Sequence, residues 1–269
     1  MQRKPAGACC PLIFEPEKVL FLETVEAWSQ PSAIDFYYKH RHEVSDLYPS
    51  ERVFLPRVLF PGIKVLDVGC ASGGFFNIMR TLEPAIDYTG IDIVKTAVDL
   101  ACQRYPEARF EVTDGEVIPF DDGTFDLVHC TSVLNNTPRY PEIWKEMYRV
   151  TNRFALADMR LLKDIGGRGS GQDSRYTIQF EGEDQEAVVP YVVSDADEVI
   201  SFLLNLNPHP QALRGTGYFH EVSELSDTPF SEVCMSILLL EKGSSATTRT
   251  KLDLQDLPLD FAVDPALVQ

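Results

Sequence analysis

The sequence predicts an α/β fold with a doubly wound, mostly parallel sheet. Between residues 63 and 160, short apolar runs typical of buried strands alternate with stretches of helical period. A glycine-rich turn, 69–74, directly follows the first apolar run. An acid, Asp92, ends the second run, 25 residues after Asp67. Strand, glycine turn, helix, strand and acid in this order indicate a nucleoside-binding βαβ unit, in which the second acid accepts ribose hydroxyls.

The remaining elements follow from periodicity and from turn residues. Residues 31–60 have helical spacing, and Pro61-Gly62 breaks the chain before the first strand. Alternation and β-branched content predict strands at 64–68, 88–91, 110–112, 125–130 and 154–159. Helical period, proline positions and acidic first turns predict helices at 74–82, 94–104 and 141–150.

The rhythm changes after the fifth strand. Residues 163–175 are too rich in glycine for regular structure, and two short strands, 176–180 and 188–193, follow as an inserted hairpin. A helix at 195–206, with Ser194 or Asp195 as its N-cap, precedes a final antiparallel pair at 213–221 and 232–240. The expected sheet therefore has seven strands, the last one antiparallel, and a hairpin inserted after the fifth.

This reading divides the chain into three parts. We expect an N-terminal helical cap at 1–62 and a Rossmann-like domain at 63–242, which contains a substrate insert at about 163–193. An acidic C-terminal tail at 243–269 carries spaced leucines. We expect it to be either a mobile appendix or an arm that docks on a neighbour, and we favour the arm. With 269 residues, 44% of them hydrophobic, one elaborated domain can bury a substantial core.

Charge and hydropathy argue against several partners. The formal net charge is -17, so the average surface repels nucleic acid and anionic membrane. No apolar run approaches the roughly 18–20 residues of a membrane helix. Prolines and a glycine interrupt the first eleven residues, which does not fit a signal peptide. We therefore expect a cytoplasmic protein that binds neither nucleic acid nor membrane.

The cysteines and histidines do not predict a metal site. None of the six cysteines forms a CxxC pair, and most lie in expected core or site segments, which favours reduced thiols. The adjacent Cys9 and Cys10 are interpreted as a terminal pair without a role. His40 and His42 are too few to hold a metal without further ligands. His129 lies inside an expected strand and is interpreted as a hydrogen-bonded core histidine.

Together, these segments resemble a class I S-adenosylmethionine-dependent methyltransferase of the small-molecule type. The resemblance is close over about 63–160 and looser beyond. It is carried by Val-Leu-Asp-Val-Gly-Cys-Ala-Ser-Gly at 65–73, Gly-Ile-Asp at 90–92, Thr-Asp-Gly-Glu-Val-Ile-Pro-Phe at 113–120, Phe-Asp-Leu-Val at 125–128, Ser-Val-Leu-Asn-Asn at 132–136 and Glu-Met-Tyr-Arg-Val at 146–150. No single segment is decisive, but chance would not readily give this order and spacing.

The resemblance implies which residues surround the methionine part of S-adenosylmethionine. Gly69, Ala71 and Gly73 would let the backbone approach the cofactor, and alanine in place of the family's middle glycine would cost little. Asp67 would orient the ammonium group of the cofactor, directly or through water. Cys130 and its backbone would face the methionine chain from the end of the fourth strand.

The same resemblance implies the contacts of the nucleoside. Asp92 would accept both ribose hydroxyls, Ile93 would line the adenine face, and Asp114 would accept from the exocyclic amine. Gly115 belongs to the same cofactor-binding set.

Catalytic candidates come from the variable segments. Methyl transfer from a sulfonium needs alignment and exclusion of water, and it needs a base only if the acceptor must lose a proton. We expect Tyr37 as a lid contact and His40 as a candidate base. Asn135 stands where many relatives carry histidine; it can orient an acceptor but cannot act as a base. Arg160, at the end of the fifth strand, would hold an anionic acceptor.

The sequence thus predicts methyl transfer to a small-molecule acceptor, on oxygen rather than nitrogen, with an anionic biosynthetic intermediate as one candidate. Two alternatives stay open. The chain could be a non-catalytic methyltransferase-fold subunit that serves a partner, or an NAD(P)-dependent oxidoreductase, which also uses a glycine turn and an acid. A homodimer is one assembly that the sequence allows.

Overall fold

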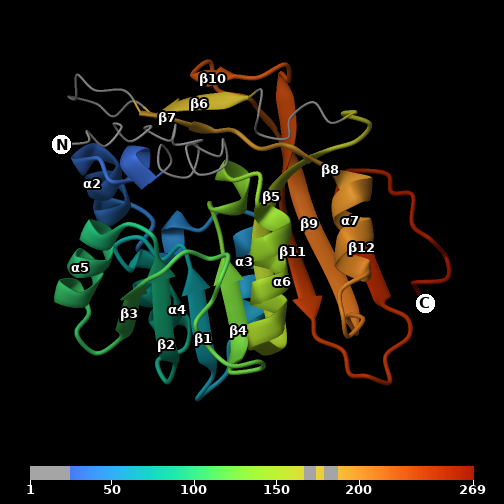
Figure 1. Ribbon diagram of the computed structural model, residues 1–269, viewed down its shortest axis with the longest axis horizontal. Coiled ribbons are helices and arrows are strands. Elements are labelled where there is room, and N and C mark those ends of the chain that lie inside the picture. Colours follow the sequence, from blue (N-terminus) through green and yellow to red (C-terminus); the bar gives the residue numbers. More distant parts are fainter. Residues whose placement is uncertain (1–24, 167–173, 179–186) are drawn as a thin grey trace, which may run out of the picture.

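The computed structural model describes residues 25–166, 174–178 and 187–269. Its main sheet has nine strands, and eight of them follow the spatial order β12-β9-β11-β5-β4-β1-β2-β3, with β8 paired to β5 (Figure 1). Strands β1 to β5 run parallel to one another, whereas β11 runs antiparallel to both β5 and β9. The bounds are β1 Lys64–Val68, β2 Asp87–Asp92, β3 Arg109–Val112, β4 Phe125–Cys130, β5 Thr151–Leu162, β8 Ser194–Asp195, β9 Ala212–Glu221, β11 Glu232–Glu241 and β12 Lys251–Asp256.

Helices cover both faces of this sheet. One face packs against α6 and α7 around the buried Trp144 and Leu203. The other packs against α3, α4 and α5 around Leu55 and Ile78. Since both faces are buried, the central strands are almost continuously apolar. The helices are α2 Pro31–Lys39, η1 Val44–Asp46, α3 Glu51–Val58, α4 Gly74–Leu82, α5 Lys95–Arg104, η2 Leu134–Asn136, α6 Tyr140–Val150 and α7 Ala196–Leu204.

A second, three-stranded sheet lies beyond the end of β5 (Figure 1). It consists of β6 Arg175–Ile178, β7 Ala187–Pro190 and β10 Ser226–Asp227, all antiparallel. Tyr176 packs with Leu162 and Val233, which lie on β5 and β11. The insert therefore rests on the edge at which the parallel strands end.

The fold class expected from the sequence is confirmed, and the strand count differs. The sequence predicts residues 251–256 only as part of a mobile tail or of an arm on a neighbour. Instead, β12 adds a parallel strand to the free edge of β9 in the same chain. Leu254 and Leu257 pack over Gly215, where a Cβ would lie 2.8 Å from Leu254 Cδ2. The two-residue β8 was also not expected, because so short a strand has no periodicity to detect. The division into cap, domain and tail stays a prediction.

Some expectations fall outside the described residues, namely those on Cys9, Cys10 and most of the glycine-rich stretch, 167–173. For α7 the structure selects Asp195 as the N-cap, since its carboxylate accepts from the N–H groups of Asp197 and Glu198. None of the described helices has the length and apolarity needed to cross a membrane.

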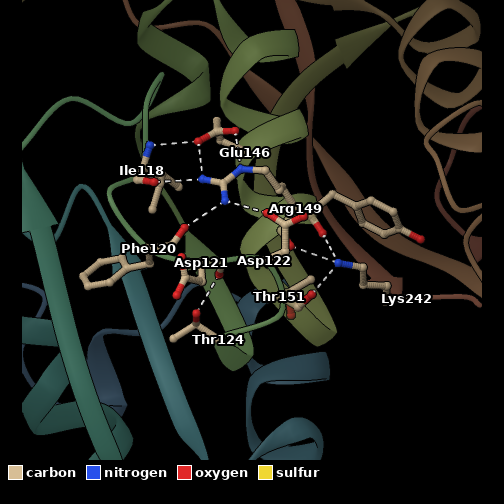
Figure 2. Close-up of polar contacts among 10 residues, drawn as sticks. Ile118, Phe120, Asp121, Asp122, Thr124, Glu146, Arg149, Thr151 and Lys242 are labelled. Atoms are coloured by element: carbon tan, nitrogen blue, oxygen red, sulfur yellow. Dashed lines mark hydrogen bonds and ion pairs between the residues drawn. The ribbon is translucent and has the colours of Figure 1, made fainter.

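Figure 2 shows Arg149, which joins α6 to the loop between β3 and β4. Its guanidinium donates to the carbonyls of Ile118 and Phe120 (2.8 Å each) and to the carboxylates of Glu146 and Asp122. Glu146 in turn accepts from the Ile118 N–H at 2.9 Å. The bonds from Arg149 are the main reason that the pKa of Glu146 lies below its usual range. This network fixes the loop that carries Asp114.

Lys242 closes the other end of the same helix. Its ammonium donates to the carbonyls of Tyr148, Arg149 and Thr151 at 2.6–3.0 Å (Figure 2). These carbonyls lie at the C-terminal end of α6, where intrahelical partners run out. One cation from the end of β11 thus satisfies them and ties helix to sheet.

We predict that Arg149→Lys lowers the free energy of unfolding by about 1–3 kcal/mol, because a single ammonium cannot replace a planar fork of five donors. Thermal unfolding followed by circular dichroism measures the loss. Arg57→Lys, at an exposed position on α3, is the matched control. Equal stability of the two variants would contradict the role given to Arg149.

Candidate active site

The candidate site lies where β1, β4 and β5 end. In an open parallel sheet, ligands bind at the carboxyl edge, because the loops that follow the strands diverge there. Three turns meet at this edge: the glycine turn after β1, the turn at Ser132 after β4, and the segment after β5. The segment between α2 and α3 also lies against this edge. It is held to α4, the helix that follows the glycine turn, because the Asn77 amide donates to the His42 carbonyl at 2.8 Å.

The glycine turn needs its glycines. Gly69 has φ +80°, and a Cβ there would lie 2.2 Å from Val133 Cγ2. Gly73 has φ +79° and is the N-cap of α4. Both conformations favour glycine, and the helix N-terminus that follows presents unpaired N–H groups. The turn therefore brings backbone close to whatever lies above β1.

Ala71 is a more demanding replacement than the sequence suggested. Its φ is +45°, in the left-handed region that L-residues avoid. In this conformation its N–H donates to Asp92 Oδ2 at 2.9 Å. The Val94 N–H donates to the other oxygen, Oδ1, at 2.8 Å. Close approach is retained at position 71, but with local backbone strain.

Asp92 is thereby fixed at the end of β2. Burial raises the pKa of its carboxyl, while the N–H groups of Val94 and Ala71 act in the opposite direction. Two backbone bonds leave lone pairs of a carboxylate for further donors. Ile93 is half-buried beside it. This placement suits acceptance from two ribose hydroxyls.

Asp114 and Gly115 lie in the loop after β3. Asp114 Oδ1 accepts from the N–H groups of Glu116 (3.2 Å) and Val117 (3.0 Å), which is a local turn. A Cβ on Gly115 would lie 3.0 Å from Val68 Cγ1, so the loop packs against the end of β1. Both residues are half-buried on the same edge as Asp92.

Asp67 is buried among protein partners. It accepts from the Tyr88 hydroxyl through Oδ2, and its Oδ1 lies 2.6 Å from His129 Nδ1. The three residues form a chain across β2, β1 and β4. The role of Asp67 toward the ammonium stays a prediction, and the structure gives each of its oxygens a side-chain partner.

The side chain of Cys130 belongs to the core, whereas its backbone lies at the site. Its thiol is fully buried with the cluster that packs on α6, and burial raises its pKa well above the usual value. Only the backbone of Cys130 is therefore available to face a ligand.

Several buried polar atoms near these turns have no hydrogen-bond partner among the described residues. They are Ser72 Oγ, Thr131 Oγ1, His129 Nε2 and His42 Nδ1. A buried polar group without a partner is destabilising, so such atoms commonly await water or a ligand. Ser72 belongs to the glycine turn and Thr131 follows β4. The turn, the fixed acid and these atoms fit a nucleoside with a polar amino-acid arm.

Asp158 lies within β5, next to Ala157, which pairs with Cys130 at the end of β4. Its carboxylate accepts from the Ser132 N–H at 2.8 Å and from the Asn135 amide at 2.9 Å. Burial and the nearby negative charge of Glu51 raise the pKa of Asp158 to about 6, against the lowering effect of the Ser132 bond and Arg160. A carboxylate with this pKa can exchange a proton near neutrality.

Asn135 and Arg160 are joined to this acid. The Asn135 side-chain oxygen accepts from the Arg160 N–H at 2.7 Å, and its carbonyl accepts from the Arg160 guanidinium at 2.6 Å. The guanidinium lies 3.9 Å from the centre of the Tyr191 ring. Asn135 is therefore a buried positioning group that orients Asp158 and Arg160.

An ion pair from the N-terminal segment lies close enough to Asp158 to influence its charge. Arg41 and Glu51, both buried, are 2.5 Å apart, and the Arg41 guanidinium stacks on Tyr48 at 4.1 Å. We call Arg41, Glu51, Asp158 and Arg160 the charged cluster. Tyr37 lies next to it: burial chiefly raises the pKa of its hydroxyl, with smaller effects of Tyr48, Arg41, Asp158 and Arg160.

Three of the four predicted catalytic residues lie near Asp158, and the fourth, His40, does not. Tyr37, Asn135 and Arg160 meet around Asp158. His40 is exposed at the end of α2, and its ring packs on Phe36 at 4.9 Å, away from the cluster's contacts.

Sequence reasoning missed Arg41, Glu51 and Tyr218. They lie far apart in the chain, in segments of ordinary composition, and come together only through packing. The Tyr218 hydroxyl on β9 has its pKa raised mainly by burial and further by Tyr48 and Glu51. Arg41 is unusual in its backbone, with a φ of +60°. Such a conformation cannot be read from the sequence, so it could not have identified the residue.

The family model of a methyltransferase domain matches residues 66–154. A probable phthiotriol/phenolphthiotriol dimycocerosates methyltransferase 2 of Mycobacterium ulcerans is 36% identical over 110 residues, which cover 39% of this chain and 42% of that protein. A demethylmenaquinone methyltransferase of Deinococcus radiodurans is 33% identical over 91 residues, covering 32% and 38%. The chain spans about two fifths of the length of the curated relatives it matches.

A solved SAM-dependent methyltransferase from Methanosarcina mazei superimposes with a TM-score of 0.50 at 18% identity, covering 73% of this chain and 98% of that one. This likeness concerns the fold. The resemblance seen in the sequence is confirmed, and S-adenosylmethionine is the cofactor of such domains. Residues 66–154 are therefore a methyltransferase domain, set in a chain with the class I S-adenosylmethionine-dependent methyltransferase fold.

Proposed function

We propose that this chain transfers the methyl group of S-adenosylmethionine to a small-molecule acceptor. One observation carries the proposal: the glycine turn of the methyltransferase domain lies beside a buried charged cluster that contains an acid with a pKa near neutrality. The first feature suits the cofactor and the second suits an acceptor that loses a proton.

The geometry supports a set of cofactor contacts. Asp92, fixed by two backbone N–H groups, would accept from the ribose hydroxyls. Asp114, in the loop held by Arg149, would accept from the adenine amine, with Ile93 against the ring. Gly69 and Gly73 would allow the methionine arm to lie on the turn. Bound in this way, the sulfonium supplies an already activated methyl group.

The protein then has to align the acceptor and exclude water. Tyr37, on α2, lies close enough to the charged cluster to interact with it electrostatically, and it would serve as a lid contact. Tyr191, stacked on Arg160, closes the side toward the small sheet. Both rings are amphipathic, so they can remove water from the acceptor and still offer a hydroxyl.

Asp158 is the group that would take the acceptor's proton. Two of its lone pairs are used by Ser132 and Asn135, which hold it in one orientation. Near neutral pH it is ionised and can accept from a hydroxyl whose oxygen attacks the methyl carbon. This arrangement favours oxygen over nitrogen as the methylated atom.

Arg160 would set the charge of the acceptor. Within the described residues, its guanidinium has one hydrogen-bond acceptor, the Asn135 carbonyl, so further N–H groups can bind a carboxylate or phosphate. The relatives named above are described as methyltransferases of phthiotriol/phenolphthiotriol dimycocerosates and of demethylmenaquinone. The charged cluster of this chain suits an anionic biosynthetic intermediate.

Location and assembly are part of the same proposal. A net charge of -17 disfavours nucleic acid and anionic membrane as partners. We retain a cytoplasmic enzyme, with a homodimer as one assembly.

Asp92→Ala should weaken binding of S-adenosylmethionine and of its demethylated product at least tenfold, because two bonds to a charged acceptor are lost. Calorimetric titration measures this. Asp99→Ala, on the exposed face of α5, is the control and should bind like the parent protein. No binding by the folded parent protein would overturn the enzyme proposal and favour a non-catalytic subunit.

The acceptor class is tested by incubating the protein and cofactor with small acids, phenols and phosphorylated sugars. We expect a mass gain of one methyl group on a member of the panel, and Arg160→Lys should reduce it for the anionic members. Methylation of a protein substrate, with none of the panel, would contradict the small-molecule proposal.

Asp158 also predicts a pH dependence of stability. Its folded-state pKa of about 6 exceeds the unfolded value of 3.8, so the folded state retains a proton that the unfolded state releases between these values. Stability contributed by this group therefore falls as pH rises from about 4 to about 6, by up to about 3 kcal/mol. Asp158→Asn should remove this slope. Denaturant unfolding of both proteins at pH 4.5 and 7.5 tests it, and parallel curves would refute the assignment.

A further inference from the structure

His129 differs from a satisfied core histidine in one respect. Its Nδ1 pairs with Asp67, but its Nε2 is buried and has no partner among the described residues. The whole residue is 1% exposed, so water does not reach it freely. The Tyr88 hydroxyl occupies the other oxygen of Asp67. Neither oxygen of Asp67 is left without a protein partner.

The ring has a fixed position next to the glycine turn. His129 and Asp67 are register partners on neighbouring strands, one residue before β4 ends. The ring packs on Phe75, in the first turn of α4, with centroids 4.5 Å apart. Because Nδ1 points to β1, Nε2 points away from Asp67. Ser72 Oγ and Thr131 Oγ1 are the other unpartnered buried atoms at these two strand ends.

The tautomer of the neutral ring follows from the partner of Nδ1. A carboxylate that faces Nδ1 makes that nitrogen the donor, and in the neutral ring the opposite nitrogen is then an acceptor. An acceptor with a lone pair matches an ammonium group. The nearby cation Arg41, which packs on the same Phe75 ring at 5.2 Å, is neutralised by Glu51.

We propose that His129 Nε2 accepts a hydrogen bond from the ammonium group of the methionine part of S-adenosylmethionine, and that Asp67 acts through His129 as a positioning residue. This rests on the cofactor site proposed above. It replaces a direct bond from Asp67 by a chain from Asp67 through His129 to the ligand.

The experiment compares two ligands and two proteins. The ligands are S-adenosylhomocysteine and its analogue in which hydrogen replaces the amino group. The variant is His129→Asn, since an asparagine amide can still donate to Asp67 but has no atom in the place of Nε2. We expect the variant to bind S-adenosylhomocysteine roughly 10- to 100-fold more weakly, the value of a bond to a charged group. Its affinity for the analogue should change less than about threefold.

Two further variants separate this role from a structural one. Tyr88→Phe removes the other partner of Asp67 and should leave the preference for the amino ligand within about threefold of the parent protein. His129→Gln can place an amide oxygen near the position of Nε2 and should recover part of that preference, which also covers the case in which His129→Asn folds poorly. Circular dichroism confirms folding.

The outcomes are distinct. Equal weakening of both ligands in His129→Asn, or unchanged binding of both, overturns the role of His129. Equal binding of both ligands by the parent protein would also overturn the role of His129, because the ammonium group would then not be recognised. If the folded parent protein binds neither ligand, the proposed cofactor site itself is wrong.

Discussion

A buried carboxylate at the end of a strand must be given N–H donors, and the site is built around this requirement. Desolvation of an unpaired carboxylate is strongly unfavourable. Asp92 is satisfied by the N–H of Ala71, and Asp158 by the N–H of Ser132. Both donors are non-glycine residues with positive φ, at +45° and +61°. The strained turns therefore aim their amides at the acids, and strain at these positions is compensated by those bonds.

The N-terminal segment completes the site through a second buried charge. Arg41 also has a positive φ, at +60°, and its guanidinium pairs with Glu51 between the rings of Tyr48 and Phe75. Removing one member of such a pair leaves an uncompensated charge in the interior. The pair thus fixes the segment before α3 against the first turn of α4.

Periodicity and turn residues predicted the parallel core, because buried strands and amphipathic helices leave strong local patterns. The glycine turn after β1 and Asp92 at the end of β2 could also be predicted. Their order and their separation along the chain are visible in the sequence itself. The charged cluster was not, because Arg41, Glu51 and Asp158 meet only through tertiary packing. In the sequence, Asn135 only stands where many relatives carry a histidine base. In the structure it is hydrogen-bonded to Asp158 and Arg160 and holds both in position. The strand β12 escaped notice because its edge position leaves only alternate leucines.

Gly74 allows close backbone contact between α4 and the N-terminal segment that contains Arg41. A Cβ at this position would lie 2.3 Å from the Arg41 carbonyl oxygen, so backbone meets backbone between the N-terminal segment and α4. The two cannot be varied independently. A different N-terminal segment would fit only if its backbone passed position 74 at the same depth. A chimeric protein would therefore have to exchange the glycine turn and this segment together.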